Sequence, residues 1–266
     1  GWKMLCAVIK GPSLKEARKQ IIESLPNADC VELRLDHFDT LEIKPLKEEF
    51  PDLPMIFTLR PNPQVDEDKR LRNIQALCSL APAYFDIEHG INPQFLEQLR
   101  TDFPAIKWIY SYHDFQCTSD NLEMILQKLH QQPADYYKLA LSGHSTNDAL
   151  RLITLPSTPK DIRISMGPHG LISRLSPSPF TYTAANETCI SAPGQLTLKN
   201  FMQTYHFGKN HLMLGLIGGN VAKSISEITH NAMMKSLGIP GTYVKMQVEP
   251  HELEQFIDLA RKSNIH

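Results

Sequence analysis

The chain has 266 residues, a formal net charge of -2 at pH 7, 42% hydrophobic residues and 21% charged residues. This balance gives no overall attraction to nucleic acid or to an anionic membrane, so an anionic ligand would need local positive charge. No apolar run reaches the roughly 20 residues of a membrane helix. The five cysteines are scattered, with no CxxC pair and no zinc spacing. We therefore expect reduced thiols, no metal site and a cytoplasmic protein.

From residue 4 to about 205, short β-rich runs alternate strictly with helical patterns. The predicted strands are Met4–Lys10, Cys30–Leu35, Met55–Arg60, Tyr84–Glu88, Lys107–His113, Tyr136–Leu141, Asp161–Met166 and Phe180–Ala185. The predicted helices are Ser13–Leu25, Leu41–Phe50, Asp66–Ala81, Pro93–Phe103, Ser119–Gln131, Thr146–Leu155, Leu171–Leu175 and Leu196–Tyr205. Eight such units in about 200 residues are typical of a closed (β/α)8 TIM barrel. A doubly wound open sheet is the alternative, but its glycine-rich turn is missing after the first strand.

The pattern changes after residue 205. Residues 206–210 are predicted to be a linker, and the segment that follows predicts two strand–helix units: Leu212–Ile217, Ser226–Leu237, Thr242–Val248 and His251–Lys262. About 55 residues are too few for a doubly wound domain. We therefore divide the chain into a barrel over 1–208 and the incomplete start of a second α/β domain over 209–266. We expect this second part to be poorly ordered or prone to association, because its strands would present unpaired edges.

Lys138 lies in the middle of an apolar, strand-like run, residues 135–142. Burial of an unpaired ammonium costs several kcal/mol or forces the group neutral. A neutral amine is the form that attacks a carbonyl to make a Schiff base. For this residue alone, an exposed edge strand or a side chain that reaches water is the alternative explanation.

Polar groups gather where the predicted strands end, which is where a barrel of this kind has its active site. These residues are Glu32, Arg34, Arg60, Asp86, Glu88, His113, Lys138, Ser165 and Arg174, with Ser191 and Gln195 after the eighth strand. Each has a structural explanation by itself: Glu32 and Arg34 could pair, and His113 could be a buried histidine with a partner. Their concentration at one rim favours catalysis.

The motifs themselves resemble type I 3-dehydroquinate dehydratase across residues 4–205. They are Glu32-Leu-Arg34-Leu-Asp36, Leu59-Arg60, Tyr112-His113-Asp114-Phe115, Tyr137-Lys138, Ile164-Ser165-Met166-Gly167, Ile172-Ser173-Arg174 and Ser191-Ala-Pro-Gly-Gln195. The resemblance implies that Lys138 forms an iminium with 3-dehydroquinate and that His113 acts as base and then acid. It implies that Arg174 binds the substrate carboxylate and that Glu32, Arg34 and Arg60 position ring hydroxyls. Ser191 and Gln195 would lie on a loop that closes over the substrate.

One segment departs from that family's pattern. The family carries a glutamate in a glycine-containing segment shortly after the Arg60 position, where it orients the catalytic histidine. Residues 61–69 here contain no glycine. The acidic residue that orients His113 is therefore left open among Glu67, Asp66 and Glu88.

The end of the sequence resembles the start of shikimate dehydrogenase, through Gly215-Leu-Ile-Gly218, Val221-Ala-Lys-Ser224-Ile-Ser226 and His230-Asn231-Ala232. The resemblance implies shikimate binding by Ser224 and Ser226, although helix capping is an alternative role for them. Glu227 replaces the proline usual in that family. Its catalytic residues and nucleotide-binding domain would follow residue 266, so we expect neither an NADP site nor dehydrogenase activity here.

The favoured function is dehydration of 3-dehydroquinate to 3-dehydroshikimate in the shikimate pathway of aromatic amino-acid biosynthesis, without cofactor or metal. A class I aldolase-type barrel acting on another keto substrate is one alternative, and a non-catalytic binding fragment is another. Arg174 and the 191–195 loop argue against the first, and Lys138 with His113 argues against the second. The expected partner is the small-molecule substrate, with no nucleic acid or membrane, and a homodimer is compatible with the sequence.

Overall fold

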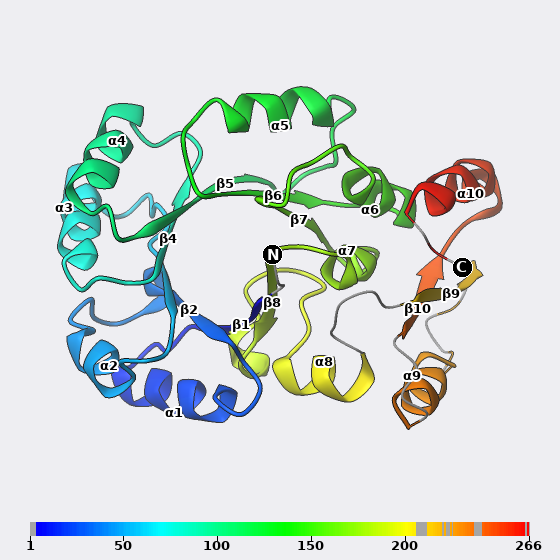
Figure 1. The fold of residues 1–266 in the computed structure, drawn as a ribbon, viewed down its shortest axis with the longest axis horizontal. Coiled ribbons are helices and arrows are strands. Elements are labelled where there is room, and N and C mark those ends of the chain that lie inside the picture. The colour runs from blue at the N-terminus through cyan, green and yellow to red at the C-terminus, as the bar shows by residue number, and fades with distance from the viewer. Residues whose placement is uncertain are drawn as a thin grey trace.

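The computed structural model describes residues 4–205, 212–219, 221, 224, 226–236, 241–263 and 265. Eight parallel strands form a barrel surrounded by helices (Figure 1). The strands are β1 (Met4–Ile9), β2 (Cys30–Arg34), β3 (Met55–Thr58), β4 (Tyr84–Glu88), β5 (Lys107–Asp114), β6 (Tyr136–Ser142), β7 (Asp161–Met166) and β8 (Phe180–Ala184). Their order is β7-β6-β5-β4-β3-β2-β1-β8, and no ladder in the described ranges joins β8 to β7. The predicted (β/α)8 architecture is confirmed, with a seam between these two strands.

Eight helices alternate with the strands, as the sequence predicts. They are α1 (Leu14–Ser24), α2 (Lys44–Glu49), α3 (Glu67–Cys78), α4 (Pro93–Asp102), α5 (Leu122–His130), α6 (Thr146–Ile153), α7 (Leu171–Leu175) and α8 (Leu198–Thr204). Side chains of Ser13, Asp66, Ser145 and Thr197 accept hydrogen bonds from backbone N–H groups in the first turns of α1, α3, α6 and α8. Such caps satisfy donors that have no partner inside the helix, and so they fix where each helix begins.

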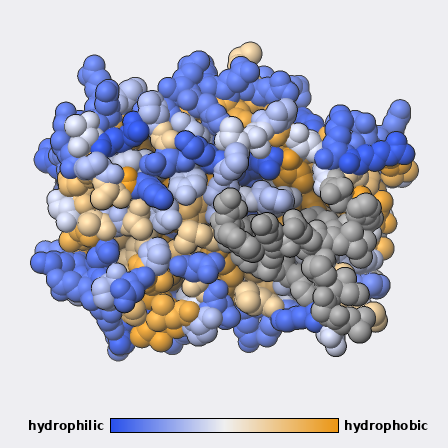
Figure 2. Space-filling model, viewed as in Figure 1, coloured by the Kyte–Doolittle hydropathy of each residue, from blue (hydrophilic) through white to orange (hydrophobic). Residues whose placement is uncertain are grey.

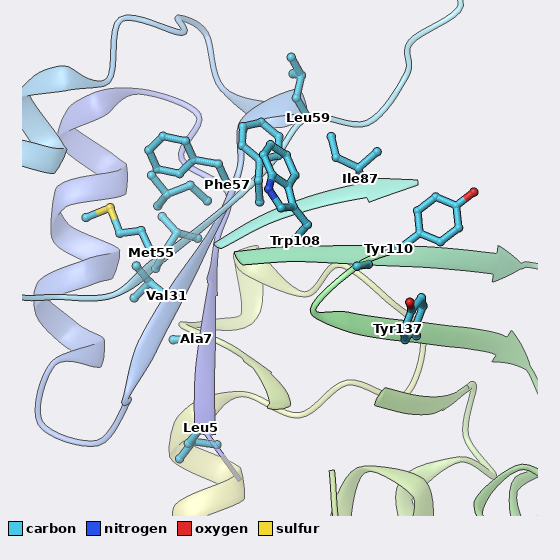
Figure 3. Packing of buried hydrophobic residues seen from close by; sticks show 14 of the residues in the cluster. Leu5, Ala7, Val31, Met55, Phe57, Leu59, Ile87, Trp108, Tyr110 and Tyr137 are labelled. Carbon is cyan, nitrogen blue, oxygen red and sulfur yellow. The ribbon is translucent and has the colours of Figure 1, made fainter. Parts of the chain in front are cut away.

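Alternation along the strands separates two apolar regions. Val31, Met55, Phe57 and Trp108 pack between the strands and the outer helices (Figure 3). A smaller cluster, which includes Cys6, Cys30, Ile56, Ile109 and Tyr182, is buried separately. Because successive side chains point to opposite faces of a strand, Glu32 and Arg34 share the face of Cys30. The inner apolar cluster thus forms a floor beneath the polar residues.

The second part of the chain contains β9 (Leu212–Gly218), α9 (Ser226–Ser236), β10 (Gly241–Gln247) and α10 (Leu253–Lys262). Strands β9 and β10 pair with each other in parallel, and α10 packs beside α6 of the barrel (Figure 1). These elements match the predicted ones. The predicted linker, residues 206–210, lies outside the described residues. The boundary at residue 208 and the poor order or association of the second part stay predictions.

Hydrophilic side chains dominate the outer helices in the view of Figure 2, with small hydrophobic areas between them. Within the described ranges, no helix has the length and apolar character needed to cross a membrane. No group of three or more histidine, cysteine, aspartate or glutamate side chains in those ranges could hold a metal ion.

Candidate active site

A cavity of about 440 Å³ opens at the carboxyl ends of the barrel strands. The lining side chains include all eight residues predicted for the dehydratase site: Glu32, Arg34, Arg60, His113, Lys138, Arg174, Ser191 and Gln195. They come from β2, the segment after β3, β5, β6, α7 and the loop that follows β8. The fold thus brings together residues that are up to 163 positions apart in the sequence, from 32 to 195.

Lys138 is buried on β6, with 6% of its surface exposed. Its Nζ lies 2.6 Å from Oδ2 of Asp86 and 4.6 Å from the centre of the Tyr182 ring. The sequence interpretation treats this lysine as an amine without a partner, whereas the structure gives it a carboxylate and an aromatic face. Attack on a carbonyl needs the neutral amine, and both contacts fix the position of its nitrogen in the cavity.

Asp86 is the centre of the polar network and is 1% exposed. Its Oδ1 lies 2.8 Å from a terminal nitrogen of Arg60 and accepts a 2.7 Å hydrogen bond from Ser111 Oγ. Burial would raise the pKa of Asp86, but Arg60 and then Lys138 outweigh it and hold the pKa well below its usual range. The sequence places Asp86 among the polar groups at the strand ends but gives it no individual role. The missing signal was physical: a buried lysine needs a carboxylate nearby, and here that carboxylate comes from β4, on the far side of β5.

Replacing Asp86 with asparagine should lower the free energy of unfolding by about 3–5 kcal/mol, because Arg60 and Lys138 would lose their buried counter-ion. Urea unfolding followed by circular dichroism measures the change. Asp102→Asn, at the exposed end of α4, is the matched control and should change stability by less than about 0.5 kcal/mol. An equal effect of the two variants would contradict the role of Asp86 as the shared counter-ion.

His113 lies near the end of β5 and stacks on Phe115, with ring centres 5.7 Å apart. Burial lowers the pKa of His113 to about 2, and the positive charges of Arg60 and Lys138 contribute in the same direction. Asp86 is the carboxylate that opposes this shift. The imidazole is therefore neutral at ordinary pH, which is the form that can accept a proton.

The three acidic candidates for orienting His113 have different surroundings. Asp66 caps α3, and Glu67 accepts hydrogen bonds of 3.0 and 2.8 Å from Arg70. Glu88 also accepts a 2.7 Å hydrogen bond from Arg70, but it lines the cavity that contains His113. None of the three forms an ion pair with His113 in the described part of the chain. Of the three, only Glu88 lines the cavity together with His113. Which of them orients His113 stays a prediction.

Arg34 and Glu32 do not pair with each other, which was the structural alternative for them. The Arg34 guanidinium donates two hydrogen bonds to Asp36, of 3.2 and 3.0 Å. Oε2 of Glu32 accepts a 2.8 Å hydrogen bond from Thr58. Both side chains are thereby fixed while they line the cavity.

Arg174 is carried by α7, which lies directly on β7. The Ser165 N–H donates to Ser173 Oγ, at 2.8 Å, instead of to a neighbouring strand. A Cβ added to Gly170 would lie 1.8 Å from the Ser165 carbonyl oxygen, so only glycine permits this close approach. Burial lowers the pKa of the Arg174 guanidinium to about 10, which leaves it charged at neutral pH.

Residues 191–195, the mouth loop, line one side of the cavity. Oε1 of Gln195 accepts hydrogen bonds from the Ser191 backbone and hydroxyl, of 2.8 and 3.2 Å. The Gly167 N–H donates to the Pro193 carbonyl at 2.9 Å and ties the loop to the end of β7. Hydrogen bonds between Ser191 and Gln195 therefore fix the positions of these two predicted residues relative to each other.

The cavity lining also includes residues that were not predicted as site residues, among them His89, Ser111, Phe115 and Tyr182. Ser111 could have been found from alternation, because it lies two residues before His113 on the same face of β5. Tyr182 looks like an ordinary core residue in the sequence. Its place beside Lys138 depends on the pairing of β8 with β1, which no local pattern specifies.

The predicted shikimate-binding residues lie in the second part of the chain. The Ser224 carbonyl accepts a 3.2 Å hydrogen bond from Lys245 Nζ, while the Ser226 side chain lies outside the described residues. Glu227 pairs with Lys245 at 3.0 Å and accepts a 3.4 Å hydrogen bond from the Tyr205 hydroxyl. Glu227, which stands where the family usually has proline, thus links α9 to β10 and to Tyr205, the residue that follows α8.

A buried lysine, a neutral histidine and three arginines at the mouth of a (β/α)8 barrel define a site suited to an anionic carbonyl compound. The family model described as type I 3-dehydroquinase matches residues 5–211, and that of the shikimate dehydrogenase substrate binding domain matches residues 216–266. The chain therefore belongs to the type I 3-dehydroquinase family. Both resemblances inferred from the motifs are confirmed.

Similar proteins include the shikimate biosynthesis protein AroDE of Chlamydia pneumoniae, 33% identical over 97% of this chain and 56% of that protein. The bifunctional 3-dehydroquinate dehydratase/shikimate dehydrogenase of Arabidopsis thaliana is 31% identical over 92% of this chain and 44% of that protein. The chain thus spans about half the length of these curated relatives. The structure of 3-dehydroquinate dehydratase from Geobacillus kaustophilus has a TM-score of 0.65 and 22% identity, covering 75% of this chain and 88% of that one. That likeness supports the barrel fold.

Proposed function

We propose that this chain dehydrates 3-dehydroquinate to 3-dehydroshikimate through a Schiff base on Lys138. The observation that carries the proposal is the buried Lys138 amine in a cavity that also holds His113 and Arg174. A Schiff-base enzyme needs an amine screened from water, a base near the reacting carbon and a cation for the substrate carboxylate. These three side chains supply those needs without a metal or a cofactor.

The reaction begins with proton transfer from Lys138, for which the neutral imidazole of His113 is the available base. The amine attacks the C3 carbonyl, and the oxygen leaves as water with a proton from His113, so that an iminium forms. His113 then removes a proton from C2, and the electron pair enters the iminium. Return of these electrons expels the C1 hydroxyl, which leaves as water with the proton held by His113. Hydrolysis of the new iminium releases the product and the amine.

Borohydride reduction in the presence of 3-dehydroquinate, followed by peptide mass mapping, tests this mechanism. We expect a stable adduct on the peptide that contains Lys138, and none when substrate is omitted. An active protein without such an adduct would refute the Schiff base. An adduct formed only with another keto acid would favour the aldolase-type alternative.

Arg174→Lys should raise the KM for 3-dehydroquinate by about 10- to 100-fold, with a smaller change in kcat. Lysine keeps the positive charge but loses the planar fork that binds both carboxylate oxygens. Steady-state kinetics measures the effect. The same change at Arg72, an exposed residue of α3, is the control and should leave KM unaltered. A kcat defect without a KM defect would contradict the carboxylate-binding role.

For residues 216–266 we propose a contribution to shikimate binding, supported by the match to the substrate-binding family of shikimate dehydrogenase. NADP would be the cofactor of a complete second domain and has no role in the dehydration. With these 266 residues alone we expect no NADPH-dependent reduction of 3-dehydroshikimate, which absorbance at 340 nm measures directly. The predicted homodimer also remains a proposal.

A further inference from the structure

The first turn of helix α6 forms hydrogen bonds with the second part of the chain. The Thr146 hydroxyl donates a 2.8 Å hydrogen bond to the Gln247 carbonyl, at the end of β10. The Asn147 amide donates a 3.1 Å hydrogen bond to the Glu252 carbonyl, just before α10. Thr146 is 2% exposed and Asn147 is 4% exposed. Buried polar side chains have partners in native structures, and here those partners are carbonyls of the other part of the chain.

Both α6 and α10 carry buried apolar side chains. Leu150 of α6 belongs to the same buried cluster as Phe256 and Leu259 of α10. Figure 1 shows α10 lying beside α6 on the outside of the barrel. Close-packed side chains of this kind transmit displacement, so the position of α6 depends on whether α10 is docked.

The segment between β6 and α6 also contacts the loop that follows His113. The Thr118 hydroxyl donates a 3.0 Å hydrogen bond to the Ser142 carbonyl. Nε2 of His144 lies 2.6 Å from the Gln116 carbonyl oxygen. Through these two contacts, the start of α6 borders the proton-transferring side of the cavity.

Three glycines connect the same segment to the mouth loop. Gly143, Gly167 and Gly194 follow β6, β7 and β8, and the Gly143 N–H donates to the Met166 carbonyl at 2.9 Å. A Cβ added to Gly194 would lie 2.1 Å from the Gly167 carbonyl oxygen, and one at Gly167 would lie 3.2 Å from that of Gly143. With the bond from Gly167 to the mouth loop, these contacts form a backbone-to-backbone path without flexible side chains.

We propose that docking of the β10–α10 segment on α6 positions the mouth loop, so that the second part of the chain tunes substrate binding in the barrel. The inference rests on the proposed function, in which the mouth loop holds 3-dehydroquinate. Thr146 and Asn147 are positioning residues, because they act through α6 and the glycine path and touch no substrate. Linkage makes the effect mutual: a ligand that fixes the mouth loop tightens the docking of α10.

The test replaces Thr146 with valine and Asn147 with alanine in the full chain, which removes both donors. We expect the KM for 3-dehydroquinate to rise about 3- to 10-fold, with kcat changed less than about twofold. Hydrogen exchange should accelerate in both α10 and the mouth loop. Thr146→Ser, which keeps the hydroxyl, should behave as the unaltered protein. Thr101→Val on exposed α4 is the matched control.

Faster exchange in α10 with unchanged KM and unchanged mouth-loop exchange would overturn the proposal. If the double variant leaves α10 docked, Leu259→Arg places a charge in the contact and separates the helices, and the same readouts decide. Exchange in β1–β4 must stay unchanged, which separates undocking from general unfolding. If the protein without substitutions shows neither turnover nor a borohydride adduct, the proposed function is refuted. The exchange measurements would still decide whether docking of α10 is coupled to the mouth loop.

Discussion

Lys138→Ala should abolish turnover of 3-dehydroquinate, with kcat reduced more than about 10⁴-fold, and should eliminate the borohydride adduct. No other residue can replace a covalent nucleophile, so the loss is far larger than that of a binding contact. The lysine also neutralises Asp86, with Nζ 2.6 Å from the carboxylate. The variant therefore needs a check that it remains folded, by circular dichroism and by substrate affinity in calorimetry.

Lys107 provides the control for this experiment, because it is an exposed lysine at the opposite end of a barrel strand. Lys107→Ala should keep both turnover and the adduct. Residual turnover of Lys138→Ala above about one percent would mean that the amine assists the reaction without bonding to the substrate. A folded variant that still binds 3-dehydroquinate but does not convert it would support the covalent role.

His113→Asn should lower kcat by about 10²- to 10⁴-fold, the usual contribution of one positioned acid–base group. His113 also transfers protons while the Schiff base forms, but water can carry protons in that step, whereas removal of the C2 proton needs a positioned base. The iminium therefore still forms in this variant, and removal of the C2 proton becomes slow. Borohydride should therefore trap the adduct on the variant in high yield. His251→Asn, at an exposed histidine of the second part, should leave the rate unchanged. Loss of the adduct together with the rate would show that Schiff-base formation, and not removal of the C2 proton, depends most on His113.

The same variant should change how stability depends on pH. Burial, followed by Arg60 and Lys138, lowers the pKa of His113 from 6.5 to about 2 in the folded protein. Between these values the unfolded chain binds a proton that the folded chain does not, so stability rises with pH and is lost as pH falls below about 6.5. Urea unfolding between about pH 7 and pH 4 should show a smaller acid-induced loss for His113→Asn. Parallel curves for the two proteins would contradict the shift.

Local patterns were sufficient to predict the barrel and several of the residues that line its cavity. Alternation of strand and helix gave the (β/α)8 order, and the carboxyl ends of the strands identified the residues that line the cavity. The motif resemblance supplied the chemistry, which the patterns alone left open among several carbonyl reactions. Lys138 and His113 are conspicuous because they are polar residues in apolar strands. Arg174 lies on the short helix α7, and its predicted role came from the motif resemblance.

The remaining features depend on contacts between distant segments. Asp86 was visible at a strand end, but its contacts with Arg60 and Lys138 require β3, β4, β5 and β6 to lie in register. The sequence predicts a closed barrel, whereas no ladder within residues 4–205 joins β7 to β8. The docking of α10 on α6 joins distant parts of the sequence: Asn147 and Glu252, which form a hydrogen bond, are 105 positions apart. The spacing of apolar residues within one helix does not specify which other helix it packs against.

The seam between β7 and β8 has a consequence for how this barrel can evolve. The Ser165 N–H, which a closed ladder would bond to β8, is taken by the Ser173 hydroxyl, and α7 rests on that open edge. The next residue along α7 is Arg174, which enters the cavity. Substitutions that complete the ladder would add backbone hydrogen bonds but would displace the helix that carries this cation. If Arg174 binds the substrate carboxylate as proposed, backbone pairing and anion recognition compete for one strand edge.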